Sequence, residues 1–591
     1  MQKQHLPAPR GAANGTGWGR RSAALALAAG VLTVVPQAAR AAAPVDTTPT
    51  SVIVQAVPAR SADAEAAVAR LGGHVNRELG IVGGFAATVP ASRLAALSAD
   101  SAVSAVTRDA HIQLFNIGGY DNVADVNSVY NVTRMTGAQA FWSNGYTGQG
   151  VDVALIDTGV VPVNGLTAAG KVINGPDLSF DSQVPQLANY DGYGHGTHMA
   201  GIIAGRDDAA VGGAYVRDSS DFIGMAPDAR ILNVRVGDHS GAADVSQVIA
   251  AIDWVVQHRT DNGLNVRVLN LSFGTDSSQS YLLDPLAFAA EQAWNQGIVV
   301  VASVGNLGTT AGHVSDPGSD PYVIAVGAVD TQGSLSTDQH NVASFSSRGD
   351  GVRNPDVVAP GVHVASLRDP GSVLDTTFGA TADVGSRFFR GTGTSQATAA
   401  VSGAAALIIS QHPEYSPDQV KYVLTHSASR LEDQGSVAQG RGEINLRSAL
   451  STRAPIQWLA AQRFLPATGL GSLQAARGSL TLTANGVTLA GELDVMGKPF
   501  NSAAMAALEA GGVSWVGGSW NGSGWSGSGW SGSGWSGSGW SGSGWSGSGW
   551  SGSGWSGSGW SGSGWSGSGW SGSGWSGSGW SGSGWSGAYW S

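Results

Sequence analysis

Five short segments rich in Val and Ile stand out along the middle of the chain. Each is long enough for a strand, and longer stretches with helical spacing separate them. The five segments are residues 151–156, 230–236, 266–271, 298–302 and 323–329. Apolar strands that alternate with helices predict a parallel sheet with crossover helices. We therefore expect an α/β domain over residues 130–450.

A smaller α/β unit precedes this domain. Residues 51–57 alternate as a strand, and a helical pattern over residues 62–71 ends at Gly72-Gly73. We then expect a strand pair over residues 81–89, a helix over residues 93–99 and a strand over residues 102–106. The order β-α-β-β-α-β predicts a ferredoxin-like α+β module over residues 42–120.

The N-terminal residues have the pattern of an export signal. Arg20-Arg21 precede an apolar run over residues 22–35, and Ala39-Arg40-Ala41 offers a cleavage site. This run is shorter than the roughly 20 residues that a spanning helix needs. We expect a signal peptide over residues 1–41 and a secreted protein with no membrane span. An uncleaved membrane anchor is the alternative.

The C-terminal quarter of the chain, from residue 451 on, has a different pattern. A hairpin is expected around Asn485-Gly486, which makes residues 451–510 a small β-rich linker region. From Trp515 to Trp590 a Trp recurs every five residues in a Ser-Gly-Ser-Gly-Trp frame, which accounts for 16 of the 21 Trp. Residues 511–591 are either a flexible Gly/Ser chain or a pentapeptide-repeat solenoid. In both cases evenly spaced Trp faces suit stacking on cell-wall polysaccharide.

Composition narrows the classes of function. The chain of 591 residues has 31 Lys and Arg against 42 Asp and Glu, a formal net charge of −11. This balance argues against a nucleic-acid partner. The absence of Cys from the sequence excludes disulfides, cysteine nucleophiles and thiolate metal sites.

Three segments place reactive side chains at a strand end or a helix start. Asp157 follows the first strand, His195 lies in Gly194-His195-Gly196-Thr197-His198, and Ser395 lies in Gly391-Thr392-Gly393-Thr394-Ser395. Taken singly, they could be a turn residue, half of a His195/His198 metal pair and a helix cap. Together they supply a hydroxyl nucleophile, an imidazole base and a carboxylate that orients the base.

These segments resemble those of the subtilisin-type serine endopeptidases. The resemblance extends over residues 130–450, through Gly224-Met225-Ala226-Pro227, Leu269-Asn270-Leu271-Ser272-Phe273-Gly274, Val301-Ala302-Ser303-Val304-Gly305-Asn306 and Ala359-Pro360-Gly361. It implies that Asp157 orients His195, that His195 is the general base and then the acid, and that Ser395 is the nucleophile. It further implies Asn306 as an oxyanion-hole donor and residues 42–120 as an inhibitory propeptide. The Trp/Gly/Ser tail of this chain resembles the tails of some actinobacterial members of the family.

The same resemblance indicates the substrate-binding residues. Residues 237–241, beginning at Gly237, would pair with an extended peptide. The primary pocket would be lined by Ser272, Phe273, Gly274, Ser303, Val304, Gly305 and Ser315. These residues are uncharged, so we expect broad cleavage after apolar residues.

Two positions depart from the family pattern. Gln396 stands where Met usually follows the nucleophile, and Ala399 stands where Pro is usual. Neither is a proton-transfer group, so activity is still expected. The chemistry requires no cofactor. Structural calcium is common in the family, but no contiguous carboxylate loop supports it, and Asp207-Asp208 could be ligands or solvated charge.

The sequence therefore predicts a secreted serine endopeptidase that acts on proteins or peptides and is made as a self-processed zymogen. A catalytically silent surface-binding protein on the same scaffold is the main alternative. A structural wall protein, in which the Trp tail is the main functional part, is the second.

Overall fold

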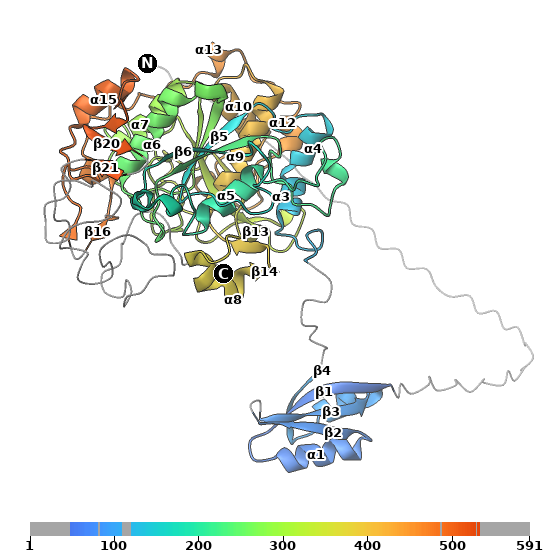
Figure 1. Cartoon of the computed structure of the whole chain (residues 1–591). Coiled ribbons are helices and arrows are strands. Elements are labelled where there is room, and N and C mark those ends of the chain that lie inside the picture. Colours follow the sequence, from blue (N-terminus) through green and yellow to red (C-terminus); the bar gives the residue numbers. More distant parts are fainter. Residues whose placement is uncertain are drawn as a thin grey trace, which may run out of the picture. The chain divides into compact units, whose positions relative to one another are not determined.

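The computed structural model describes residues 48–80, 83–108, 120–480, 482–484, 487–526 and 529–531 (Figure 1). The expected signal peptide and the tail beyond Ser531 lie outside the described residues. The chain divides into two compact units, Met1–Asn116 and Ile117–Ser591.

The first unit contains a four-stranded sheet and two α-helices in the order β-α-β-β-α-β. Its elements are β1 (Pro49–Ala56), α1 (Ser61–Arg70), β2 (His74–Leu79), β3 (Gly84–Pro90), α2 (Leu94–Ser98) and β4 (Val103–Arg108). The strands lie in the order β2-β3-β1-β4, and all neighbours are antiparallel. The strand pair expected over residues 81–89 is instead formed by β2 and β3. Val52, Val54, Val68 and Phe85 are buried in the unit's own core.

The second unit is built around an eight-stranded, mostly parallel sheet. The strand order is β11-β10-β9-β8-β5-β7-β6, and β12 also pairs with β10. The strands are β5 (Asp152–Asp157), β6 (Val172–Asp177), β7 (Arg230–Arg235), β8 (Val266–Leu271), β9 (Val299–Ser303), β10 (Ile324–Asp330), β11 (Asn341–Val342) and β12 (Val357–Pro360). Among the described pairings of this sheet, β10–β11 is the antiparallel one. The expected α/β architecture with a mostly parallel sheet is confirmed.

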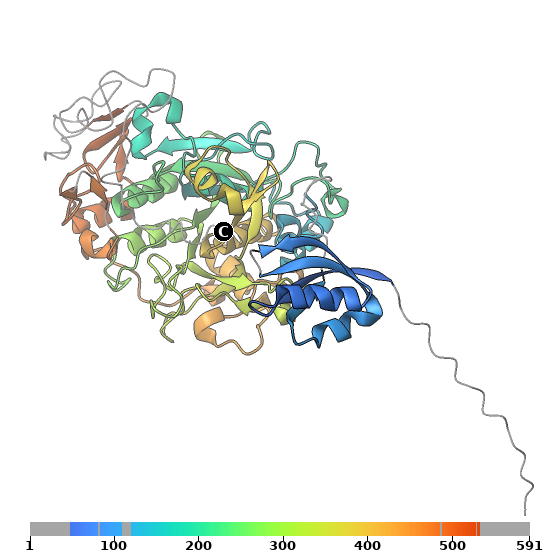
Figure 2. The ribbon, with the colours of Figure 1, turned by 90° about the horizontal axis from the view of Figure 1, so that it is seen from below.

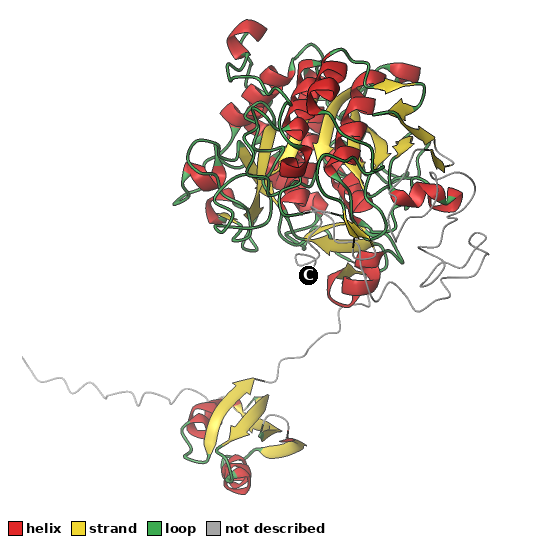
Figure 3. Cartoon of the chain, turned by 90° about the vertical axis from the view of Figure 1, so that its left-hand side faces the viewer, coloured by secondary structure: helices red, strands yellow, loops and turns green. Residues whose placement is uncertain are grey.

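Helices enclose this sheet (Figure 3). The long helix α9 (Thr394–Gln411) contacts α5 (His195–Ala204) and strands β5, β8, β9, β10 and β12. A second pair, α6 (Val245–His258) and α7 (Pro285–Asn295), packs side by side. The helix α9 runs through Ala399 without interruption, because Ala has the backbone N–H that Pro lacks.

Residues 451–510 differ from the expected β-rich linker. They hold the helices α13 (Gln457–Ala460), α14 (Leu473–Ala476) and α15 (Ser502–Ala510), and a hairpin of only β16 (Thr483–Ala484) and β17 (Val487–Thr488). Leu473, Met496 and Phe500 belong to the same buried cluster as the central sheet. The segment is therefore packed onto the α/β domain, because its scattered apolar residues complete that core.

The first Trp repeats are also folded. β18 (Trp515–Val516), β19 (Ser519–Trp520), β20 (Ser523–Ser526) and β21 (Gly529–Ser531) form an antiparallel sheet. The Gly517-Gly518 and Asn521-Gly522 loops have positive φ at both residues, as two-residue hairpin turns require. Trp515 and Trp520 are buried, and their Nε1 atoms donate to Ala250 and Asp253 of α6. The orange-red strands of this sheet lie beside the green helices of the domain (Figure 2). The Trp residues of the first two repeats therefore belong to the folded core and are not exposed stacking faces.

Candidate active site

Asp157 is the last residue of β5, the strand between β8 and β7 in the sheet. Its carboxylate is fully buried and accepts a hydrogen bond from the Thr158 N–H at 2.8 Å. A Cβ at Gly196 would lie 3.0 Å from Asp157 Oδ1 and only 2.1 Å from the Gly159 carbonyl. Glycine at position 196 therefore allows the helix that carries His195 to approach this carboxylate.

His195 is the first residue of α5, and its side chain faces Asp157. Nδ1 of His195 lies 2.8 Å from Oδ1 and 3.0 Å from Oδ2 of Asp157. An ionised carboxylate can only accept, so the proton of a neutral imidazole is held on Nδ1 and the lone pair on Nε2. This is the tautomer that a general base needs.

Ser395 lies in the first turn of α9. In this structure its hydroxyl donates to the Ser272 carbonyl oxygen at 2.7 Å. Attack on a substrate therefore requires a rotation of the hydroxyl toward the imidazole. Its backbone N–H belongs to the helix turn whose donors have no intrahelical acceptor, so it can serve an oxyanion.

Asn306 lies beside the start of α9. Its Oδ1 accepts from both the N–H and the hydroxyl of Thr394, each at 2.9 Å. Because these two donors fix the oxygen end of the amide, the Nδ2 donor must point the other way. Nδ2 lies 3.4 Å from the position that a Cβ of Gly393 would occupy, next to the nucleophile.

The expected pocket residues are brought together around Ser315. The Ser315 N–H donates to the Val304 carbonyl at 3.0 Å, and Thr275 and Asp316 exchange backbone hydrogen bonds of 2.9 and 3.0 Å. A Cβ on Gly274 would lie 3.1 Å from Ser315 Cβ, and one on Gly305 would lie 2.1 Å from its hydroxyl. Ser272 and Phe273, directly after β8, and Ser303, the last residue of β9, are buried.

One carboxyl group near this pocket escaped the sequence analysis. Asp316 follows Ser315 and is buried. Burial, reinforced by Asp284, raises the pKa of Asp316 well above its usual range. Burial therefore disfavours the charged form of this carboxyl group.

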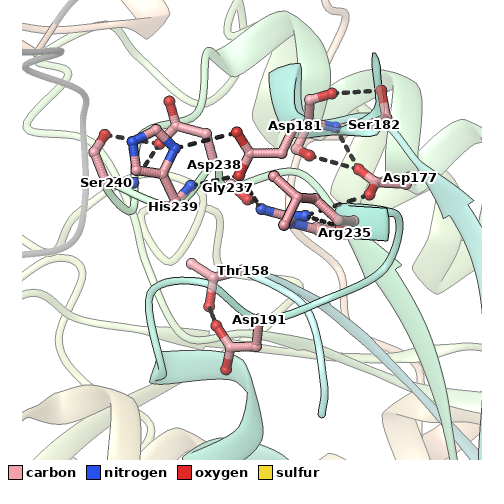
Figure 4. A network of polar contacts seen from close by, with 12 residues as sticks. Thr158, Asp177, Asp181, Ser182, Asp191, Arg235, Gly237, Asp238, His239 and Ser240 are labelled. Carbon is pink, nitrogen blue, oxygen red and sulfur yellow. Dashed lines mark hydrogen bonds and ion pairs between the residues drawn. The ribbon is translucent and has the colours of Figure 1, made fainter. Parts of the chain in front are cut away.

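The edge segment that begins at Gly237 is held by a buried charge network (Figure 4). Arg235, at the end of β7, donates to the Gly237 carbonyl at 3.0 Å and pairs with Asp181 and, at 3.5 Å, with Asp177. Asp181 also accepts from the His239 N–H at 2.8 Å and from its Nδ1 at 3.1 Å. These contacts raise the pKa of the partly exposed His239 despite its desolvation.

Two further residues, Asp191 and Thr158, hold the His195 loop and were not predicted from the sequence. Asp191 accepts from Thr158 Oγ1, Gly194 N and Thr197 N, each at 2.7 Å, and Thr158 Oγ1 accepts from the Gly196 N–H at 3.0 Å. Arg235, which holds the edge segment through the Gly237 carbonyl, was also not predicted. Two signals were available in the sequence. Arg235 is a charged residue at the end of an apolar strand, and Asp191 stands four residues before His195.

The two suggested metal-binding features have other roles. Nε2 of His198 lies 3.0 Å from the Phe389 carbonyl and 3.2 Å from that of Val364, and burial lowers the pKa of this His to about 3. Asp207 pairs with Arg387 and accepts from the Phe222 N–H, whereas Asp208 is exposed. Within the described residues, no cluster of three His, Asp or Glu side chains is arranged to hold a metal ion. In the same residues, no helix is long and apolar enough to cross a membrane.

Comparison with known proteins agrees with this arrangement. The subtilase family model matches residues 148–442. Serine protease AprX of Bacillus subtilis is 37% identical over 310 residues, which cover 51% of this chain and 67% of that protein. Subtilisin E of Bacillus subtilis is 33% identical over 396 residues, which cover 66% of this chain and 86% of that protein. The alkaline protease of Alkalihalobacillus alcalophilus is 33% identical over 356 residues, 60% of this chain and 76% of that protein. The chain belongs to the subtilase family and is a serine-type peptidase.

Proposed function

We propose that the protein is a secreted endopeptidase that uses Asp157, His195 and Ser395 as its triad. The contact of His195 Nδ1 with the buried Asp157 carboxylate is the observation that carries this proposal. It leaves Nε2 as the base, at the start of a helix whose loop is fixed by Asp191.

Catalysis follows from these positions. Ser395 Oγ bonds to the substrate carbonyl carbon while His195 Nε2 takes the hydroxyl proton. Asn306 Nδ2 and the Ser395 N–H donate to the oxygen that becomes negative. The protonated imidazole then gives its proton to the leaving amine as the C–N bond breaks. Water, deprotonated by the same imidazole, hydrolyses the acyl-enzyme and restores Ser395.

A fluorophosphonate label tests the assignment of the nucleophile. The wild type should be labelled and should hydrolyse peptides, whereas Ser395→Ala should do neither. Ser410→Ala, the same change near the other end of α9, is the matched control and should behave as the wild type. A wild-type protein that takes no label and cleaves no peptide would favour the silent binding protein.

We propose further that residues 42–120 are an inhibitory propeptide removed by the enzyme itself. The separate, compact first unit between the expected signal peptide and the catalytic domain supports this role. Ser395→Ala produced in a host without other proteases should keep residues 42–120 attached. Removal of this unit from that variant would show that processing does not need Ser395.

The repeats beyond Ser531 are proposed to retain the enzyme on cell-wall polysaccharide. Trp continues every five residues to Trp590 and no charged residue follows Glu509, so retention should resist salt. A chain that ends at Ser531 should elute from purified cell wall, and the full chain should stay bound in 1 M NaCl. Equal elution of the two chains would refute this role.

A further inference from the structure

The C-terminal segment, residues 451–531, contacts the start of α6 through Arg477. This helix begins shortly after the edge turn, residues 237–241, where an extended substrate would pair. Asp244 caps this helix, because its Oδ1 accepts from the Ser246 N–H at 3.0 Å and its own N–H donates to Gln247 Oε1 at 2.6 Å. Arg477 donates from Nε to Asp244 Oδ2 at 2.7 Å and from Nη2 to Oδ1 at 3.2 Å. A residue more than two hundred positions away thus holds the cap of α6.

This ion pair is completely enclosed. The Arg477 and Asp244 side chains are 0% and 1% exposed, and Arg477 also donates to the carbonyls of Gly491 and Leu493. Desolvation offsets much of the attraction between buried charges, so such a pair contributes more to fixed geometry than to stability. Its geometry is bidentate, which sets both the distance and the angle of the cap.

Two short paths join Asp244 to the edge turn over residues 237–241. On one side, Ala242 and Asp238 are joined by backbone and side-chain hydrogen bonds of 3.0 and 3.1 Å, which close the turn two residues before Asp244. On the other side, Gln247 Nε2 donates to the Leu178 carbonyl at 2.8 Å, and the Leu178 N–H donates to the Arg235 carbonyl at 2.7 Å. Both ends of the turn are therefore tied to the start of α6.

We propose that Arg477 is a positioning residue for substrate binding, which acts through Asp244 on the edge turn that begins at Gly237. The inference rests on the proposed function of this edge. A strand-like substrate is bound by main-chain hydrogen bonds, so a displaced edge weakens every one of them. A substrate too short to reach the edge should be unaffected.

The structure also supplies a matched control. Trp520 Nε1 donates to Asp253 Oδ2 at 2.7 Å, in the middle of the same helix. Trp520→Phe removes a buried hydrogen bond between the C-terminal segment and α6 but leaves the helix cap intact. This variant therefore distinguishes a general loosening of the C-terminal segment from an effect that acts specifically through Arg477 and Asp244.

The test compares an extended tetrapeptide amide with a single-residue ester, with active enzyme counted by fluorophosphonate labelling. Arg477→Met should raise KM for the tetrapeptide by roughly 2- to 30-fold and leave kcat/KM for the ester unchanged. Arg477→Lys keeps the charge without the bidentate contact, so its KM for the tetrapeptide should lie between those of the wild type and Arg477→Met. Asp244→Asn keeps an acceptor for Ser246 and should raise KM as Arg477→Met does, which covers the case in which Arg477→Met does not fold.

Three results would overturn the proposal. They are an unchanged tetrapeptide KM in the Arg477 and Asp244 variants, an equal loss on ester and tetrapeptide, and the same KM rise in Trp520→Phe. Failure of the proposed function has a different signature, since the wild type itself would then neither be labelled nor cleave either substrate.

Discussion

At the scale of single residues, the amide of Asn306 should be the main side-chain contribution to the oxyanion hole. Thr394 holds its oxygen end, so Nδ2 is the end of the amide that can donate to developing charge. Asn306→Ala should lower kcat by about 10²–10³, the usual effect of losing one such donor, with little change in KM. Steady-state kinetics on a peptide amide measure this. An unchanged kcat would make Asn306 a purely structural partner of Thr394.

Gln396 should be a destabilising residue behind the nucleophile. It is buried, and neither its Oε1 nor its Nε2 has a hydrogen-bond partner in the structure. An unsatisfied buried polar group costs about 1–3 kcal/mol, so Gln396→Met should raise the free energy of unfolding by about 1 kcal/mol or more. Denaturant unfolding of the Ser395→Ala background avoids self-digestion.

Gln439→Met is the control for this change. The Gln439 amide is equally buried but bonds to Leu431 and Gln434 through both of its ends. Loss of these bonds should lower the free energy of unfolding. If Gln396→Met and Gln439→Met change the free energy of unfolding in the same direction, the difference in hydrogen bonding does not decide their stability.

The sequence could predict which residues of the site react but not what holds them. Local sequence motifs were enough to predict the chemical roles of the reacting residues Asp157, His195, Ser395 and Asn306. Arg235, Asp181 and Asp191 act through contacts between segments, and an isolated Asp or Arg has many ordinary roles. Such contacts depend on how the loops pack, which no local pattern encodes.

At the scale of elements, strands were predictable where both faces are buried. All six residues of β5 are buried, so its apolar run is continuous. In contrast, no residue of β2 is buried, and its His, Asn, Arg and Glu side chains gave no strand pattern. That is why the antiparallel pair in the first unit was placed too late in the sequence.

The contact between α6 and the tail root, residues 514–523, should weaken as pH rises. Burial raises the pKa of Asp253 to about 7, although Trp520 and Ser514 donate to it, and burial beside Asp253 also raises the pKa of Glu509. The folded state therefore binds protons more tightly than the unfolded state, whose Asp titrates near 4. The contribution is full below about pH 4 and is lost as pH rises through about 7.

Thermal unfolding between pH 5 and pH 8.5 measures this loss. In the Ser395→Ala background the midpoint should fall with pH by at least about 2 °C. Asp253→Asn keeps an acceptor for Trp520 but removes the ionisation, so its midpoint should depend less on pH. Asp494, with a pKa raised to about 6 chiefly by burial, leaves some dependence in this variant. An unchanged slope would show that the root is not coupled to Asp253.

At the scale of the whole molecule, the prediction made from composition was wrong for the start of the repeat tail. A Gly/Ser frame with regular Trp has no mixed apolar core of its own, which favours a flexible chain. Its first two repeats instead use the core of the catalytic domain. Trp515 donates from Nε1 to the Ala250 carbonyl at 2.8 Å, and Gln257 Oε1 accepts from the Trp515 N–H at 2.7 Å. A low-complexity segment can thus be structural when its partner surface is elsewhere in the chain.

The fold of the catalytic domain should therefore need the tail root, residues 514–523. The repeats that it does not need should begin after this root. The sequence alone suggests that a chain cut after Glu509 keeps its hydrolytic activity. The structure predicts otherwise, because this cut removes Trp515 and Trp520 from the core and takes the Trp520 N–H donor away from the buried Asp253. Removing a large buried aromatic side chain costs about 3–5 kcal/mol.

Calorimetry of Ser395→Ala chains that end at Glu509 or at Ser531 tests this boundary. The longer chain should melt with the full-length protein, and the shorter chain should melt lower by about 7–12 °C, because two such Trp are lost. Trp458→Ala in the full-length chain is the control: this Trp is 63% exposed, so its loss should leave the midpoint unchanged. If the Glu509 chain instead melts with the full-length protein, the buried Trp residues do not stabilise the catalytic domain. All sixteen repeats would then be free to act outside the fold.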